Sequence, residues 1–169
     1  MNILETGRLA LRQLTVDDAA FVLELLNEPS FLQFIGDKGV RNLDDARNYI
    51  LTGPMASYER FGFGLWLVVL KADAAPIGIC GLLKRDTLPD VDIGFAFRPA
   101  FWSKGYAFEA ASAVLTHGRE AFGLRRIVAI TSPDNASSAA LLEKLGLRFE
   151  RTLTLSGDSA DIRLFAVET

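Results

Sequence analysis

The stretch that decides the fold is residues 92–110, which read D-I-G-F-A-F-R-P-A-F-W-S-K-G-Y-A-F-E-A. A strand-like run ends at Arg98-Pro99, and a short loop leads into a long helix whose first turn contains Lys104 and Gly105. Glycine lets the backbone approach a ligand closely. The first N–H groups of a helix have no partner within it and lie at the positive end of its dipole. The segment predicts a site for a phosphate or pyrophosphate, although a helix start without a ligand is an open alternative.

A second segment, residues 131–138, also joins a strand to a helix. It reads T-S-P-D-N-A-S-S, and its simplest interpretation is that Asp134 or Asn135 caps the helix that follows. Ligands of α/β proteins commonly bind at the carboxyl ends of strands. We therefore expect the two helix starts to face one crevice if their strands are neighbours.

Hydrophobic patterns outside these segments predict the remaining elements. The predicted strands are residues 8–14, 62–71, 76–84, 91–97, 125–131, 147–155 and 160–168, and the predicted helices are 15–26, 42–58, 104–122 and 132–145. Residues 30–41 are expected to form an irregular loop, Gly53-Pro54 to break or split the second helix, and Ser156-Gly157-Asp158 to turn the last hairpin. The predicted class is α/β (α+β), with a mixed, largely antiparallel central sheet of about seven strands and helices on both faces.

Composition excludes several kinds of protein. The 169 residues predict a single domain over 1–169 and contain one cysteine, Cys80, and one histidine, His117. An internal disulfide and the usual zinc sites are therefore excluded, and we expect no metal site. The net charge of −3, without a basic block, argues against nucleic-acid binding. Charged residues interrupt any apolar signal region near the N-terminus, and the longest apolar run, 61–70, is too short to span a membrane. The low cysteine count predicts a cytoplasmic protein with no membrane partner.

The order and spacing of the motifs resemble the GNAT superfamily of acyl-CoA-dependent N-acetyltransferases, in particular the RimJ/RimL type. The matching stretches are E-T-G-R-L-A-L-R (5–12), Asp17-Asp18, W-S-K-G-Y-A (102–107) and N-A-S-S-A-A-L-L-E-K-L-G-L (135–147). The resemblance runs from about residue 5 to residue 167. It implies the GNAT fold and acetyl-CoA as the cofactor.

The resemblance also implies which residues contact coenzyme A. The family's pyrophosphate loop, [QR]-x-x-G-x-[GA], corresponds to Trp102, Ser103, Lys104, Gly105, Tyr106 and Ala107. Trp102 departs from the pattern, which puts a polar side-chain contact from that position in doubt. The backbone of the preceding strand, at Phe95, Ala96 and Phe97, would pair with the pantetheine arm, and an N–H near Phe95 would stabilise the thioester oxyanion. Asn135 would contact the cofactor and Ser138 the leaving thiolate.

A carboxylate is expected to act as general base for the amine. Asp92 is the first candidate, because relatives carry a Glu at the corresponding strand position, and the alternative is an ordinary carboxylate at a strand start. Asp90 and Asp86 are further candidates from the adjacent turn. Glu109 is expected to cap or pair structurally.

The other notable side chains are expected to be structural. His117 lies about three turns into the long helix, Cys80 lies in a strand, and Phe63 and Trp66 are core candidates. Phe31, Phe34 and Tyr49 fall where this family shapes its acceptor site, although packing is the stronger interpretation.

The leading hypothesis is an N-acetyltransferase that uses acetyl-CoA and acts on a primary amine, either a protein N-terminus or a small molecule. The first alternative is a non-catalytic domain that binds or senses acyl-CoA, and the second is an unrelated binder of a phosphate ligand. A homodimer is possible on this interpretation.

Overall fold

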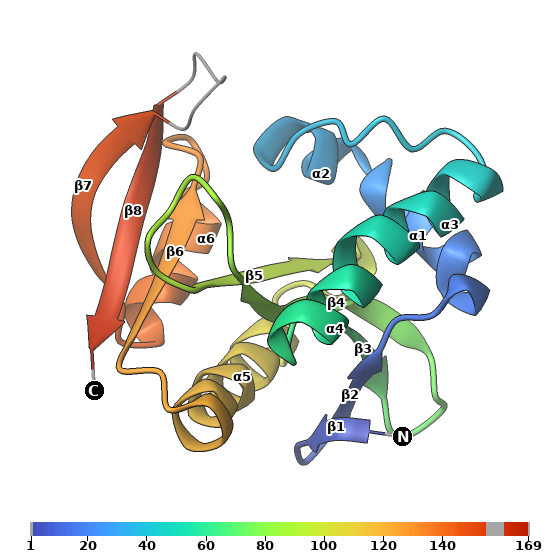
Figure 1. The fold of residues 1–169 in the computed structure, drawn as a ribbon, viewed down its shortest axis with the longest axis horizontal. Coiled ribbons are helices and arrows are strands. Elements are labelled where there is room, and N and C mark those ends of the chain that lie inside the picture. Colours follow the sequence, from blue (N-terminus) through green and yellow to red (C-terminus); the bar gives the residue numbers. More distant parts are fainter. Residues whose placement is uncertain (1, 155–160, 169) are drawn as a thin grey trace.

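The computed structural model describes residues 2–154 and 161–168 and builds them on one eight-stranded sheet (Figure 1). The strand order is β1-β2-β3-β4-β5-β6-β8-β7, and all neighbours are antiparallel except β5 and β6. The strands are β1 (Asn2–Glu5), β2 (Leu9–Gln13), β3 (Leu65–Leu70), β4 (Pro76–Leu83), β5 (Asp92–Phe97), β6 (Arg126–Thr131), β7 (Arg148–Thr154) and β8 (Asp161–Glu168). The predicted mixed, largely antiparallel sheet is confirmed. The strand beyond the predicted seven is β1, a short edge strand that pairs with β2.

The α-helices are α1 (Ala19–Leu26), α2 (Pro29–Phe34), α3 (Leu43–Ile50), α4 (Ala56–Phe61), α5 (Tyr106–Phe122) and α6 (Ala136–Lys144). Short 3₁₀ turns η1 (Val16–Asp18) and η3 (Pro99–Phe101) precede α1 and α5, and a π-helical turn, η2 (Leu51–Met55), joins α3 to α4. No helix in the described ranges is both long enough and apolar enough to cross a membrane.

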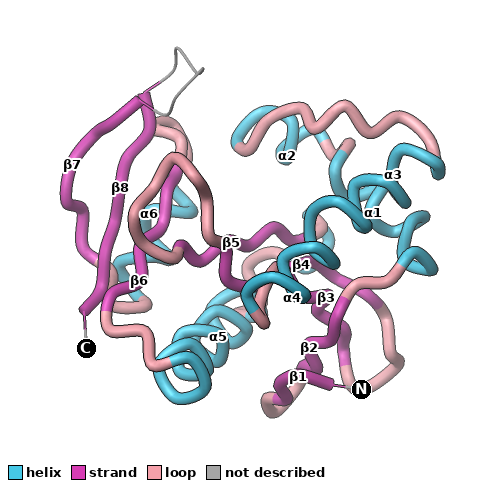
Figure 2. The backbone as a smooth tube through the Cα atoms, in the orientation of Figure 1, coloured by secondary structure: helices cyan, strands magenta, loops and turns pink. Residues whose placement is uncertain are grey.

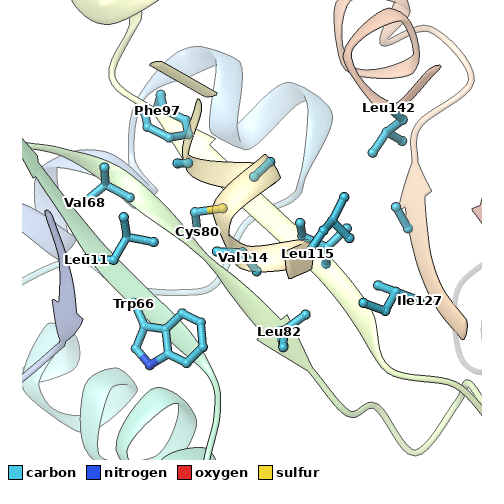
Figure 3. Close-up of a cluster of buried hydrophobic side chains, with 14 of the residues drawn as sticks. Leu11, Trp66, Val68, Cys80, Leu82, Phe97, Val114, Leu115, Ile127 and Leu142 are labelled. Carbon is cyan, nitrogen blue, oxygen red and sulfur yellow. The ribbon is translucent and has the colours of Figure 1, made fainter. Parts of the chain in front are cut away.

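Helices cover both faces of the sheet, and the alternation along β3 shows how the two cores are divided. Trp66 and Val68 pack in a core with α5 and α6, whereas Leu67 packs in a second core with α1, α2 and α3. Figure 3 shows the first core, with Trp66 and Cys80 on strands and Val114 on the helix above them. Side chains on a strand point alternately to opposite faces, so one strand supplies both cores.

The loop between β4 and β5 folds over the β6–β8 pair. Its Leu88 is buried against Val128 and Leu164 in a third, smaller core. Lys84 Nζ donates hydrogen bonds to the Arg85 carbonyl at 2.9 Å and to the Leu88 carbonyl at 2.7 Å. The loop is therefore fixed at Lys84, just before Arg85, and at Leu88, three residues after it.

One local prediction needs correction, whereas the predicted split of the second helix at Gly53-Pro54 is present. The predicted loop 30–41 begins with the helix α2, because Pro29 occupies the first turn, where a missing N–H costs nothing. Gly53-Pro54 does not end the second helix. The chain widens into the π-helical turn around Pro54, which cannot donate the usual bond, and continues into α4.

Three predicted helix boundaries are confirmed. Thr15 and Asp18 form a capping box at the start of the η1 turn, and Asn42 caps α3 by accepting from the Asp45 N–H. Gly146 follows the last turn of α6, where Leu147 N–H bonds the Leu142 carbonyl at 3.0 Å. The predicted turn at residues 156–158 lies outside the described residues.

Candidate active site

The two parallel strands at the centre of the sheet separate along their length. β5 and β6 share one register pair, Asp92 with Val128, beside a hydrogen bond of 3.0 Å from Val128 N–H to the Val91 carbonyl. Beyond that point the strands diverge, as Figure 2 shows, and α5 and α6 follow their carboxyl ends. The two strands therefore form a V, whose apex is at Asp92.

The backbone of β5 presents an open edge to this V. Arg98 N–H donates to the Ile77 carbonyl of the β4 side at 2.9 Å, so the even-numbered residues of β5 bond β4. Because backbone groups alternate along an antiparallel ladder, those of Phe95 and Phe97 point into the V. Trp102 Nε1 confirms this direction by donating to the Phe97 carbonyl at 2.8 Å. An extended segment of a ligand with amide groups can form hydrogen bonds with this open edge, as a further β-strand would.

The loop after β5 ends at an uncapped helix start. α5 begins at Tyr106, with Lys104 in the loop before it and not in the first turn as predicted. Gly105 is the N-cap residue, at φ 83°, and no side chain caps this helix. Glycine adopts this left-handed conformation without steric cost. The first N–H groups of α5 are thus directed outward at the positive end of a 17-residue helix, an arrangement suited to pyrophosphate.

Arg8, in the N-terminal segment, contacts both this loop and the first turn of α5. Arg8 Nε pairs with Glu109 Oε1 at 2.7 Å, and a second guanidinium nitrogen donates to the Lys104 carbonyl at 3.1 Å. The Arg8 guanidinium also lies 4.3 Å from the centre of the Tyr106 ring. Glu109 therefore has the structural pairing role that the sequence indicates.

Asn135 and Ser138 lie at the start of α6, across the V from β5. The Asn135 side-chain oxygen accepts from the Ser138 N–H at 3.2 Å, so Asn135 is the N-cap of α6. This use of the oxygen leaves the Asn135 amide group as a donor. Both side chains are half-buried. The simple capping interpretation of Asn135 is confirmed, and a further contact with a ligand is compatible with it.

Asp92 is a buried carboxylate with one charged partner. Its side chain is 1% exposed and pairs with Arg85 Nε at 3.2 Å. Burial raises the pKa of Asp92, and the Arg85 cation opposes that rise. Ile93 and Phe97 pack toward α5, so Asp92 faces the other side of the sheet, which carries the second core. Asp92 lies at the closed end of the V, and the strand between Asp92 and Phe97 is about 17 Å long.

The two alternative carboxylates differ from Asp92. Asp90 is paired with Arg126 at 3.0 Å, in a cluster that also contains Glu150 and Glu168. Asp86 is exposed at the loop tip. Only Asp92 is both buried and located where β5 and β6 separate.

The lone histidine packs against the first core, and the lone cysteine lies inside it. His117 packs edge-on against Trp66 and Phe122, and burial lowers its pKa. Cys80 is fully buried beside α5 (Figure 3), and burial strongly raises the pKa of its thiol. Phe63 belongs to the same core. No cluster of three or more metal-ligating side chains occurs within the described ranges.

The three aromatic residues expected near an acceptor site divide between core and pocket. Phe31 is buried in the second core, and Phe34 is half-buried on the same short helix. Tyr49 lines a pocket between the α3–α4 segment and the end of β4. Packing is thus confirmed for Phe31, while Tyr49 also faces a cavity.

Two cations of the site were missed by the sequence analysis. Arg85 lies in the β4–β5 connector, and the pairing of Leu83 with Asp92 brings it beside that carboxylate. A hairpin register drawn from the predicted strands would have indicated this pairing. Arg8 reaches the loop from almost a hundred residues away in sequence, and no local signal marks that contact.

Comparisons with known proteins agree with this geometry. A family model described as an acetyltransferase (GNAT) domain matches residues 8–148. An uncharacterized N-acetyltransferase of Bacillus subtilis (strain 168), YoaA, is 31% identical over 153 residues, which cover 89% of this chain and 85% of YoaA.

Solved structures share the whole fold. An acetyltransferase from Agrobacterium tumefaciens str. C58 superposes with a TM-score of 0.83 at 26% identity, covering 98% of this chain and 94% of that one. RimL, a ribosomal L7/L12 alpha-N-protein acetyltransferase solved with coenzyme A, has a TM-score of 0.84 at 19% identity, with 99% and 98% covered. The chain belongs to the GNAT acetyltransferase family and is an acyl-CoA-dependent acetyltransferase.

Proposed function

We propose that this protein transfers the acetyl group of acetyl-CoA to a primary amine, which attacks the thioester directly. The observation that carries the proposal is the single register pair between β5 and β6, beyond which the open edge of β5 leads to the uncapped start of α5. Acetyl-CoA supplies an activated acyl group, whose C–S bond breaks as the new C–N bond forms. The acceptor is a small amine or a protein N-terminus.

The residues present fit coenzyme A. The backbone N–H groups at the start of α5 would hold the pyrophosphate, in the loop that contains Trp102, Ser103, Lys104, Gly105, Tyr106 and Ala107. The strand segment Phe95, Ala96 and Phe97 would bind the pantetheine arm through its open edge, where the backbone groups of Phe95 and Phe97 lie. The Asn135 amide, whose oxygen is used in capping α6, would donate to the cofactor from the opposite wall.

Two side chains and one backbone N–H would assist the reaction. Asp92 would accept the proton that the amine loses, directly or through a bridging water, and its burial favours this role by raising its pKa. The Phe95 N–H points into the V and would stabilise the negative charge that develops on the acyl oxygen, a contribution of about 10²–10³ in rate. Ser138 would donate a hydrogen bond to the departing thiolate from the first turn of α6.

Two measurements test the proposal. Calorimetric titration with coenzyme A is expected to give saturable binding, and a thiol-release assay with acetyl-CoA is expected to give turnover that depends on an added amine. The assay panel contains amino acids, polyamines, aminoglycosides and peptides with free N-termini. Tight coenzyme A binding without turnover on the whole panel would mean that the domain binds acyl-CoA without catalysis. Absence of any coenzyme A binding would reject the site itself.

A further inference from the structure

A pocket of about 280 Å³ opens beside the base candidate, between the α3–α4 segment and the end of β4. Its walls include Leu65 and Leu83, which lie directly over Gly94: a Cβ added there would be 3.1 Å from Leu83 and 3.5 Å from Leu65. Leu83 also pairs with Asp92 across the β4–β5 ladder. Two wall residues of the pocket therefore cover Gly94, the residue next to Phe95, on the same face of the sheet as Asp92.

The charged side chains that line this pocket are all positive. Arg60, Lys84 and Arg85 line it, and none of the described residues in its lining is Asp or Glu. Arg85 is paired with Asp92, whereas neither Arg60 nor Lys84 forms an ion pair within the described part of the chain. Asp92 balances one of these three cations, which leaves two positive charges without an ion-pair partner among the described residues.

These cations are held in place. Lys84 is fixed by its two carbonyl partners, and Arg60 lies 4.9 Å from the centre of the Phe61 ring, which also lines the pocket. Arg85 uses only its Nε for Asp92, and its side chain is 36% exposed. Its two terminal nitrogens make no hydrogen bond within the described residues. A guanidinium whose two terminal nitrogens are available in this way is suited to binding a second carboxylate.

The exposed Lys38 does not line the pocket, but its ammonium is close enough to Arg85 for the Arg85 charge to contribute, after desolvation, to a lowered pKa of Lys38. An ammonium group without a carboxylate of its own would meet a net repulsion from Arg60, Lys84 and Arg85 on entering this pocket. The same cations would favour the neutral form of an amine that is held there by another group, which is the form that attacks a thioester.

We propose that the acceptor is a small primary amine that carries a carboxylate, as amino acids do, with the carboxylate bound between Arg60 and Arg85. This inference rests on the proposed acetyl transfer and specifies its acceptor. The pocket is slightly below the usual lower limit of about 300 Å³ for ligand sites, so an amino-acid-sized molecule suits it better than a folded partner. Tyr49, Thr52 and Ser57 supply neutral polar groups around the amine.

The test compares glycine, leucine, methionine, phenylalanine and glutamate with their α-amides in the thiol-release assay. Each amide keeps the size of its acid but lacks the charge of the α-carboxylate. Its amine is also less basic, and this difference alone would favour the amide. We expect at least one acid to exceed its amide about tenfold in kcat/KM. Equal or better turnover of every amide would overturn the inference and leave acetyl transfer established. Tight coenzyme A binding with no turnover on these amines, on peptides or on polyamines would instead reject the proposed function.

Arg60→Gln tests the location of the carboxylate. We expect it to raise KM for the preferred acid about tenfold, with little change in kcat and none in KM for the amide. Arg47→Gln is the matched control, since Arg47 is an exposed cation on α3 that pairs with Asp44 and does not line the pocket. The charge reversal Arg60→Glu should enlarge the effect. Unchanged KM for the acid in both Arg60 variants, with melting temperatures equal to that of the control, would overturn the assignment to this pocket.

Discussion

Arg8 and Glu109, 101 residues apart in sequence, join the first segment of the chain to the first turn of α5 through an ion pair of 2.7 Å. Glu109 also accepts from the Arg8 backbone N–H at 2.9 Å and from the Thr6 hydroxyl. Because Arg8 bonds the Lys104 carbonyl as well, the same contacts fix the candidate pyrophosphate loop. The candidate cofactor site thus depends on a pairing that lies outside the loop itself.

Glu109→Gln is expected to weaken coenzyme A binding several-fold and to lower the free energy of unfolding by about 1 kcal/mol. Burial opposes the ionised form, but bonds from Thr6 and Arg8 outweigh it and lower the pKa of Glu109. A lowered folded-state pKa means that this stabilisation is present above the unfolded-state pKa and is lost as the pH falls through the folded-state pKa. Chemical denaturation between pH 7 and pH 3 checks this. An unchanged acid dependence in the variant would contradict it.

Gly105→Val is expected to impair coenzyme A binding at least tenfold while the domain remains folded. Gly105 has φ 83°, and a Cβ there would lie 3.3 Å from the Arg8 guanidinium. A β-branched residue resists this backbone conformation, at a cost of about 1–2 kcal/mol, so the loop would shift. Gly123→Val is the matched control, because Gly123 has φ 64° at the other end of the same helix. Equal coenzyme A affinities in calorimetry for the two variants would remove the pyrophosphate assignment.

The sequence predicted those parts of the molecule that depend on local patterns. The strand–loop–helix unit around Gly105 and the start of the second predicted helix at residue 42 follow from short-range chemistry, and both are present. The helix α2 was missed because six residues carry little periodic signal, and the π-helical turn was missed because Pro54 normally ends a helix. The Arg8–Glu109 pair depends on tertiary packing, and a single sequence contains no local trace of such a contact.

Asn135→Asp separates two roles that Asn135→Ala would remove together. The Asn135 oxygen caps α6, so Ala should cost about 1 kcal/mol of stability, whereas Asp retains an acceptor at the N-cap. If the amide group donates to the cofactor, both variants should lose about 1–3 kcal/mol of coenzyme A binding energy. Thermal unfolding and calorimetry are the paired measurements. Normal coenzyme A affinity in Asn135→Asp would limit Asn135 to capping.

Asp92→Asn is expected to lower kcat about 10²-fold or more, because the variant keeps the size of the side chain but cannot accept the amine proton. Burial raises the pKa of Asp92 in the folded protein, so the acid limb of the kcat/KM profile should lie above the ordinary aspartate range and should vanish in the variant. The pH dependence of the free energy of unfolding has the opposite sign to that of Glu109. A carboxyl with a raised folded-state pKa stabilises the folded protein below its unfolded-state pKa, and this contribution is lost as the pH rises through the folded-state pKa. Asn should therefore not destabilise the protein through this linkage. Asp90→Asn is the control, since Asp90 lies two residues away and is paired with Arg126. An unaltered rate and acid limb in Asp92→Asn would restrict Asp92 to its ion pair with Arg85, whereas their loss in Asp90→Asn alone would move the base to the adjacent turn.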